Sequence, residues 1–175
     1  MTGVPDPSLA AAILSPSIHA SAVLAGAKAV LIRGPAGAGK SRLAHALIEA
    51  AQRGALPIGL LVGDDRVHLE AANGRIVVRP APALAGLLEI RGVGLLRLPY
   101  EVTAVVGLVV DLAYPQAERL PPSSAQVTAI QGISLPLLAI AVGNDPLPLV
   151  LIKLRDLASA GAVGETVLPA QVGKK

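Results

Sequence analysis

The sequence contains no cysteine, phenylalanine or tryptophan, and each absence excludes a class of protein. Without cysteine there is neither a disulfide framework nor a thiolate metal site. Because two tyrosines are the only large aromatic residues and the basic residues are scattered, we expect no nucleic-acid partner. The core has to be built from leucine, valine, isoleucine and alanine, which favours an α/β fold of apolar strands covered by helices.

Long hydrophobic runs are also missing, although 53% of the residues are hydrophobic. A helix that spans a bilayer needs about 20 consecutive apolar residues. The run Val102–Val110 stops at an aspartate, and Leu135–Val142 contains Pro136. The short apolar patch Leu9–Leu14 has no lysine or arginine before it, unlike a secretory signal. We therefore expect a cytoplasmic protein with no membrane partner.

Charged residues make up only 15% of the 175-residue chain, and the net charge is +3. A chain of this length and apolar content is suited to one compact domain with a sizeable core. We expect that domain to occupy residues 1–175, with its core at about 16–160. The small positive excess suits a phosphate-bearing ligand or an acidic partner without requiring either.

Apolar segments separated by turn signals predict the order of the elements. We expect helices at 40–53 and from about 149 to 160, and a hairpin turn at Asn73-Gly74. Strands are expected at 18–23, 29–32, 58–62, 67–69, 76–78, 87–90, 102–112, 133–138 and 139–142. This order predicts an α/β sheet with flanking helices.

A glycine-rich segment between a predicted strand and a predicted helix matches the phosphate-binding pattern G-x-x-x-x-G-K-[ST]. It reads Gly34-Pro35-Ala36-Gly37-Ala38-Gly39-Lys40-Ser41. Glycines allow successive backbone N–H groups to converge on phosphate oxygens, and the positive end of the helix adds to the attraction. Lys40 would reach the terminal phosphates and Ser41 would offer a hydroxyl to Mg²⁺. The alternative is a chance match, which the flanking strand and helix disfavour, so we expect ATP and Mg²⁺ to bind.

Two adjacent carboxylates, Asp64 and Asp65, follow a predicted strand. The carboxyl end of a strand lies beside the phosphate site in open α/β sheets. One carboxylate could therefore approach Mg²⁺ while the other accepts a proton from an attacking hydroxyl. Both could also begin a solvated turn, and Asp111 ends another apolar strand in the same way. The pattern alone does not decide between these alternatives.

The order of three further features resembles the catalytic, C-terminal domain of the bacterial HPr kinase/phosphorylase family. His19 precedes the glycine loop, Asp64-Asp65-Arg66-Val67 follows the loop helix, and residues 87–96 read LLEIRGVGLL. The last run is the most specific. The resemblance extends from about Ile18 to Arg155, without the family's N-terminal domain, as in truncated forms of the family.

This resemblance implies a fold similar to phosphoenolpyruvate carboxykinase and an ATP-dependent serine protein kinase. The implied partner is HPr, the small phosphocarrier of the phosphotransferase system, or its nitrogen-type paralogue. The implied role is regulation of carbon and nitrogen metabolism. Family members also imply a homo-oligomer, of which a hexamer is one form.

Roles of individual residues are implied position by position. Asp65 matches the general base, Asp64 its hydrogen-bonding neighbour, and Glu89 a second Mg²⁺ ligand beside the loop serine. Lys40 matches the loop lysine. His19 matches a histidine near the transferred phosphate, although spacing alone favours an ordinary strand histidine. Mg²⁺ prefers hard oxygen ligands such as these carboxylate and hydroxyl groups.

The family carries an arginine-rich segment that serves dephosphorylation, and here the corresponding segment Ala141–Pro146 has no arginine. A guanidinium is not replaced by asparagine or proline, which argues against phosphorylase activity. One rival is therefore a catalytically weak, ATP-binding sensor module. An unrelated small-molecule kinase is disfavoured, because LLEIRGVGLL would then be unexplained. Arg91 is either phosphate-facing or a surface cation, and Asp111 is structural or substrate-side.

Overall fold

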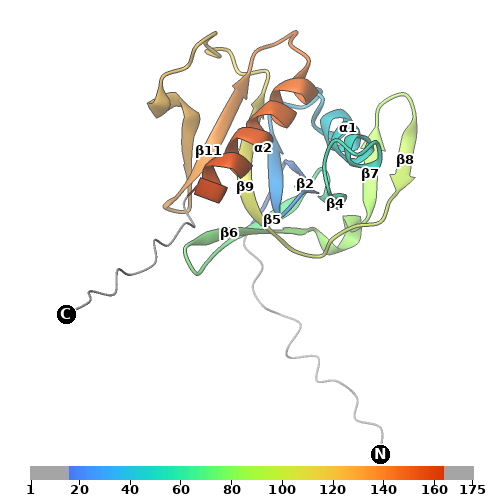
Figure 1. The fold of residues 1–175 in the computed structure, drawn as a ribbon. Coiled ribbons are helices and arrows are strands. Elements are labelled where there is room, and N and C mark those ends of the chain that lie inside the picture. The colour runs from blue at the N-terminus through green and yellow to red at the C-terminus, as the bar shows by residue number, and fades with distance from the viewer. Residues whose placement is uncertain (1–15, 164–175) are drawn as a thin grey trace, which may run out of the picture.

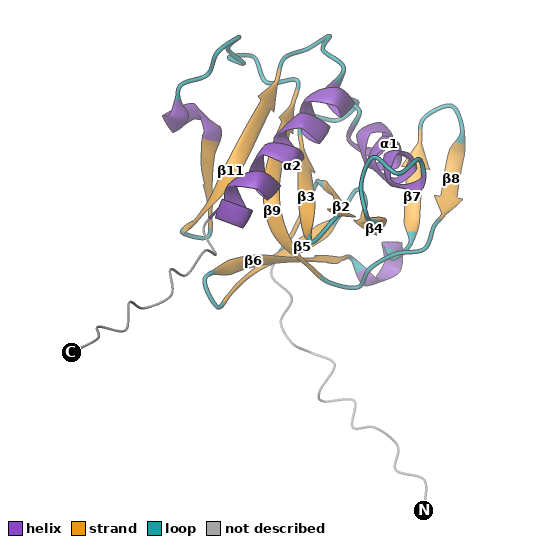
Figure 2. Cartoon of the chain, in the orientation of Figure 1, coloured by secondary structure: helices purple, strands orange, loops and turns teal. Residues whose placement is uncertain are grey.

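The computed structural model describes residues 16–163. Its strands are β1 (Ser17–Ile18), β2 (Ser21–Ala25), β3 (Lys28–Arg33), β4 (Gly59–Gly63), β5 (Val67–Ala72), β6 (Arg75–Pro80), β7 (Leu87–Ile90), β8 (Gly94–Arg97), β9 (Ala104–Leu112), β10 (Val127–Ile130) and β11 (Ile133–Ile140). Its α-helices are α1 (Lys40–Gln52) and α2 (Pro146–Val163), and short 3-10 helices lie at Pro82–Leu84 and Ser123–Gln126. The predicted α/β class is confirmed as a mixed sheet with few helices (Figure 2).

Strand β9 is the centre of the main sheet (Figure 1). It pairs in parallel with β3, from Ala29↔Val106 to Arg33↔Asp111. Strand β11 pairs in parallel with the last residues of β9, and β6 pairs antiparallel with its first residues. Beyond β3 lie β2 and then β4. The prediction of a central strand in the apolar run at 102–112 is confirmed.

Both α-helices pack on one face of this sheet. Leu47 of α1 and Val150 of α2 share a buried cluster with Ile32 of β3. The next residue back along β3, Leu31, points to the opposite face because side chains alternate along a strand. On that face the core is closed by β5 and β6, so helices cover only one side of the strands. Within residues 16–163, neither helix combines the length and apolar character needed to cross a bilayer.

Strands β3 and β4 point in the same direction although they are not neighbours. Strand β2 lies between them and pairs antiparallel with each. The carboxyl end of β4 therefore lies at the same edge of the sheet as the carboxyl end of β3. The aspartate pair that follows β4 thus lies at the edge where the glycine loop follows β3, as the sequence-based argument expected.

Three local features differ from the sequence-based expectation. Strands β8 and β10 were not expected, and β11 is one continuous strand where two, at 133–138 and 139–142, were predicted. Pairing of β11 with β9 begins only at Leu137, so at Pro136 that side of the strand carries no ladder, which proline tolerates. Helix α2 begins at Pro146, three residues earlier than expected, because proline fits the first helical turn.

The buried face of α1 can be tested through Leu47, which has no exposed surface. We expect Leu47→Ala to lower the free energy of unfolding by about 2–5 kcal/mol, because apolar contacts are lost and a cavity is left. Urea denaturation followed by circular dichroism measures this change. The control is Arg53→Ala, which removes an exposed ion pair with Glu49 and should cost less than about 0.5 kcal/mol. Equal losses in the two variants would contradict the packing described for α1.

Candidate active site

The glycine loop connects the carboxyl end of β3 to the first residue of α1 (Figure 2). Gly34 has φ 147°, and a Cβ there would lie 2.9 Å from the carbonyl oxygen of Leu112. Only glycine therefore lets the chain turn directly against the end of β9. Gly39 has φ 95° and precedes the helix in a left-handed conformation. The contact with β9 thus requires glycine at position 34, and a left-handed backbone at Gly39 leads into α1.

Lys40 is held inside the concavity of the glycine loop. Its residue is only 6% exposed, and its Nζ donates to the carbonyl oxygens of Gly34 at 2.9 Å and Pro35 at 3.1 Å. Burial lowers the pKa of the Lys40 ammonium from its usual value, and the carboxylates of Asp64 and Asp65 act in the opposite direction. The lysine thus has two acidic neighbours beyond the loop, on the side where β4 ends.

The carboxylate of Asp64 joins three elements to the end of β4. It accepts hydrogen bonds from the Ser21 hydroxyl on β2 at 2.5 Å and from the Ser41 hydroxyl on α1 at 2.9 Å. It also accepts the backbone N–H of Glu89 on β7 at 3.3 Å. Asp64 is only 4% exposed, and a buried carboxylate is costly unless its oxygens are hydrogen-bonded. This network therefore fixes where Ser41 and β7 lie.

The hydrogen bond from Ser41 determines what its oxygen can offer to a ligand. A hydroxyl has one proton and two acceptor lone pairs, and the proton is donated to Asp64. The lone pairs remain available to a cation. Ser41 and Glu89 line the same cavity of about 470 Å³, together with residues of the glycine loop. Two hard oxygen groups, from α1 and β7, are thus placed around one space.

This donor set suits Mg²⁺ that arrives with a nucleotide. Among residues 16–163, no group of three or more histidine, cysteine or acidic residues could hold a metal alone. Mg²⁺ commonly keeps several waters and binds through one or two protein oxygens together with substrate phosphates. Ser41 and Glu89 beside the glycine loop fit that pattern, whereas these two groups are too few to hold a metal by protein ligands alone.

Asp65 differs from Asp64 in both backbone and surroundings. Its φ of 62° lies in the left-handed region, which is uncommon for a residue other than glycine. The Arg66 N–H donates to the Asp64 carbonyl at 2.7 Å across this tight turn. The Asp65 side chain is 63% exposed, and its Oδ1 lies 3.2 Å from Nε2 of His19. Such strained residues cluster at functional sites.

His19 lies in a bend between β1 and β2, and not inside a strand as the sequence suggested. The chain changes partner at this point, because β1 pairs with β5 whereas β2 pairs with β3. This change of partner breaks the strand and lets the imidazole reach Asp65. The two side chains line the same cavity.

The structure brings all the predicted site residues except Gly34 and Pro35 to the lining of one cavity. Its lining includes His19, Lys40, Ser41, Asp64, Asp65 and Glu89, together with Ala36, Gly37, Ala38 and Gly39. The carbonyl oxygens of Gly34 and Pro35 accept hydrogen bonds from Nζ of Lys40. Arg91 also lines the cavity, and its Nη1 lies 3.9 Å from where a Cβ on Gly37 would be. Of the alternatives left open for Arg91, the geometry favours the phosphate-facing one.

The carboxylate of Asp111 is paired with an arginine and does not line this cavity. Its carboxylate accepts two hydrogen bonds, both of 2.7 Å, from the Arg33 guanidinium. This bidentate pair joins the carboxyl ends of β9 and β3 just before the glycine loop. Of the two alternatives left open for Asp111, the geometry favours the structural one.

The segment Ala141–Pro146, which carries no arginine, lies beside the glycine loop. Residues from this segment and from Pro35–Ala38 line a neighbouring cavity of about 360 Å³. A side chain in Ala141–Pro146 would therefore lie close to a ligand bound on the side of the glycine loop that faces this cavity.

Sequence reasoning missed Ser21. It is fully buried at the start of β2 and donates to Asp64. The available signal was weak: a lone hydroxyl in the apolar stretch Ser21–Ala25 needs a buried partner. No pattern in the sequence indicates which residue that partner is.

Comparisons with known proteins identify the family of the chain. Residues 12–152 match the family model of the HPr Serine kinase C-terminal domain. The chain therefore belongs to the HPr kinase family, and the resemblance inferred from its sequence is confirmed.

Individual relatives match parts of the chain. The HPr kinase/phosphorylase of Streptococcus thermophilus is 34% identical over 138 residues, covering 72% of this chain and 42% of the relative. That of Mycoplasma mycoides subsp. mycoides is 41% identical over 66 residues, covering 38% of this chain and 19% of the relative. The solved structure of the Hpr(Ser) kinase/phosphatase from Coxiella burnetii aligns with a TM-score of 0.69 at 25% identity, covering 83% of this chain and 98% of that one. The chain thus spans less than half the length of these two curated relatives.

The hydrogen bond from Ser21 can be tested by Ser21→Ala. We expect the free energy of unfolding to fall by about 1–3 kcal/mol, because a buried carboxylate loses one of its donors. Thermal or urea unfolding measures this change. Ser124→Ala, at an exposed position in a 3-10 helix, is the matched control and should leave stability within about 0.5 kcal/mol of the parent. No loss in Ser21→Ala would contradict the network around Asp64.

Proposed function

We propose that this chain transfers the γ-phosphoryl group of ATP to a serine hydroxyl on an HPr-type phosphocarrier protein. The observation that carries the proposal is the Asp64 network. The Ser41 hydroxyl and Glu89 lie beside the glycine loop, with the exposed carboxylate of Asp65 in the same cavity. The acceptor protein is inferred from the HPr kinase family and from the names of the relatives.

In this proposal the glycine loop and Lys40 bind the phosphates of ATP. Lys40 would exchange its bonds with the loop carbonyls for bonds with phosphate oxygens, which are stronger partners because they are charged. Ser41 and Glu89 would hold Mg²⁺, which neutralises charge on the phosphates when bound. Arg91, which lines the same cavity near Gly37, would contribute a second cation.

Asp65 is proposed as the general base. It accepts the proton of the serine hydroxyl as the bond between that oxygen and the γ-phosphorus forms and the bond to ADP breaks. Its exposed carboxylate is open to a protein substrate, whereas the buried carboxylate of Asp64 is engaged by three donors. His19, 3.2 Å from Asp65, would orient that carboxylate.

We further propose that transfer runs in the kinase direction. The segment Ala141–Pro146 lies beside the glycine loop but offers no guanidinium to stabilise an attacking or leaving phosphate. It remains a prediction that residues 1–175 form a single domain and that this domain is the catalytic unit. A closer kinship of the sheet to phosphoenolpyruvate carboxykinase also remains a prediction.

The test is incubation of the chain with ATP, Mg²⁺ and an HPr-type protein from the same genome, with mass spectrometry of the acceptor. We expect phosphoserine with the parent chain, and a loss of about 10²- to 10⁴-fold in rate with Asp65→Asn, as for removal of a general base. Asparagine tolerates the left-handed backbone at this position, so the fold should survive.

Nucleotide binding, measured by calorimetry, separates the outcomes of this test. Asp65→Asn should bind ATP nearly as tightly as the parent, and the exposed Asp156→Asn on α2 should leave both binding and transfer unchanged. Nucleotide binding by the parent without any phosphoserine would overturn the kinase proposal in favour of a sensor module. Full transfer by Asp65→Asn would exclude Asp65 as the base.

The proposed Mg²⁺ site is tested by Glu89→Gln. The neutral amide keeps the size of the side chain and the backbone bond to Asp64, but it is a weaker ligand for a hard cation. We expect the Mg²⁺ concentration needed for half-maximal transfer to rise about tenfold or more, in the range seen when groups at a metal site are altered. Glu101→Gln, outside this cavity, is the control. An unchanged Mg²⁺ requirement would remove Glu89 from the site.

A further inference from the structure

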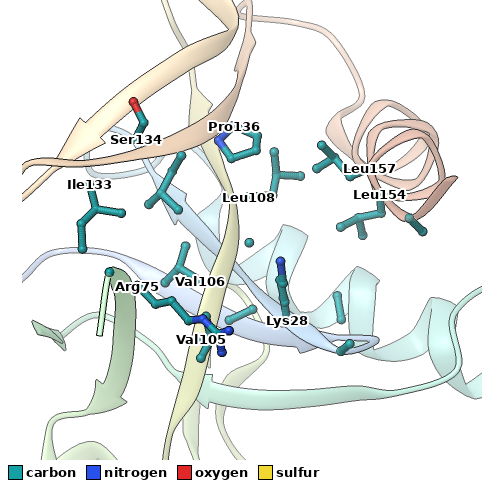
Figure 3. Close-up of a pocket in the computed structure, with 17 residues that line it drawn as sticks. Lys28, Arg75, Val105, Val106, Leu108, Ile133, Ser134, Pro136, Leu154 and Leu157 are labelled. Carbon is teal, nitrogen blue, oxygen red and sulfur yellow. The ribbon is translucent and has the colours of Figure 1, made fainter. Parts of the chain in front are cut away.

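A separate cavity of about 510 Å³ lies at the end of β3 opposite to the glycine loop. Figure 3 shows the residues that line it. It is bounded by the beginnings of β3, β9 and β11 and by the second half of α2. Strand β3 runs from Lys28 at this cavity to Arg33 before the glycine loop, a separation of roughly 17 Å at the rise of a β-strand. The cavity is therefore distinct from the proposed phosphoryl-transfer site.

The walls of this cavity are mostly apolar. They include Val106 and Leu108 from β9, Leu135 from β11, and Leu154 and Leu157 from α2. No acidic side chain belongs to the lining formed by residues 16–163. Its volume lies within the range of about 300–1,000 Å³ that is typical of small-molecule sites.

Two cationic side chains, Lys28 and Arg75, complete the lining (Figure 3). Lys28 begins β3, and Arg75 begins β6 after the hairpin turn. Within the described part of the chain, neither side chain forms an ion pair or hydrogen bond. Two unpaired cations therefore border an apolar space that contains no neutralising carboxylate.

The position of Lys28 is built into the sheet. A Cβ on Gly107 of β9 would lie 2.7 Å from both Cβ and Cδ of Lys28. The absence of a side chain at Gly107 thus leaves room for the methylene stem of the lysine to lie across β9. Long cationic side chains pack their stems on apolar surface in this way and present the charge at the end.

We propose that this cavity binds a small organic anion with one carboxylate and an apolar chain. The apolar part would occupy the space between β9, β11 and α2, and the carboxylate would accept bonds from Lys28 and Arg75. Apolar burial supplies affinity for the chain, and the two cations select an anion over a neutral molecule of the same shape. This inference does not rest on the proposed kinase activity.

The experiment titrates the full chain with octanoate, octan-1-ol and acetate, using calorimetry together with backbone amide shifts. Octanoate should bind and shift amides of 105–108 and 154–158. Octanol should bind at least about threefold more weakly because it lacks the charge, and acetate should show no measurable binding because it lacks the chain. Absence of octanoate binding, or equal binding of octanol, would overturn the proposal.

Variants locate the site. Lys28→Met keeps the length of the stem without its charge, and Arg75→Gln removes the second cation. Each should weaken octanoate about three- to tenfold, while Arg119→Gln, at an exposed position outside the cavity, should not. Circular dichroism first verifies that each variant folds. If Lys28→Met does not fold, the octanoate affinity of Arg75→Gln decides the test. Unchanged octanoate affinity in the folded variants, or amide shifts confined to other residues, would refute the assignment.

Discussion

The buried carboxylate of Asp64 is the interaction on which the arrangement of the candidate site depends. It accepts hydrogen bonds from residues on β2, α1 and β7, which are distant in sequence. Burying that carboxylate without donors would be costly, so folding itself brings these elements together. The positions of Ser41 and Glu89 around one cavity are therefore a consequence of satisfying a buried acid.

The topology of the sheet explains why this acid lies beside the glycine loop. Strand β2 is antiparallel to both β3 and β4, so the loop after β3 and the aspartate pair after β4 emerge at one edge. This is the edge at which open α/β sheets generally bind ligands. Adjacent residues then diverge: Asp64 turns into the core, and the left-handed backbone of Asp65 leaves its carboxylate exposed.

The parts of the site that sequence could predict are the local ones. The glycine loop, the start of α1 and the Asn73-Gly74 hairpin depend on neighbouring residues, so their patterns are readable. The choice between the aspartate pair and Asp111 could not be predicted from the residues alone. It depends on the ion pair between Asp111 and the Arg33 guanidinium, which forms because β3 pairs with β9. Ser21 was missed for the same reason, since its partner Asp64 is distant in sequence. Strand β10 was missed although its partner β11 follows directly, because the turn Gln131-Gly132 between them is not one of the usual hairpin pairs.

The most direct test of this account compares the free energies of unfolding of Asp64→Asn and Asp65→Asn, measured side by side. In Asp64→Asn, an NH₂ group replaces one of the carboxylate oxygens that accept hydrogen bonds, so this group would face other donors. We therefore expect the free energy of unfolding to fall by about 1–3 kcal/mol. In Asp65→Asn, the new side chain is exposed and suits the left-handed backbone, so stability should stay within about 0.5 kcal/mol of the parent. Equal losses, or a loss confined to Asp65→Asn, would contradict the central role assigned to Asp64.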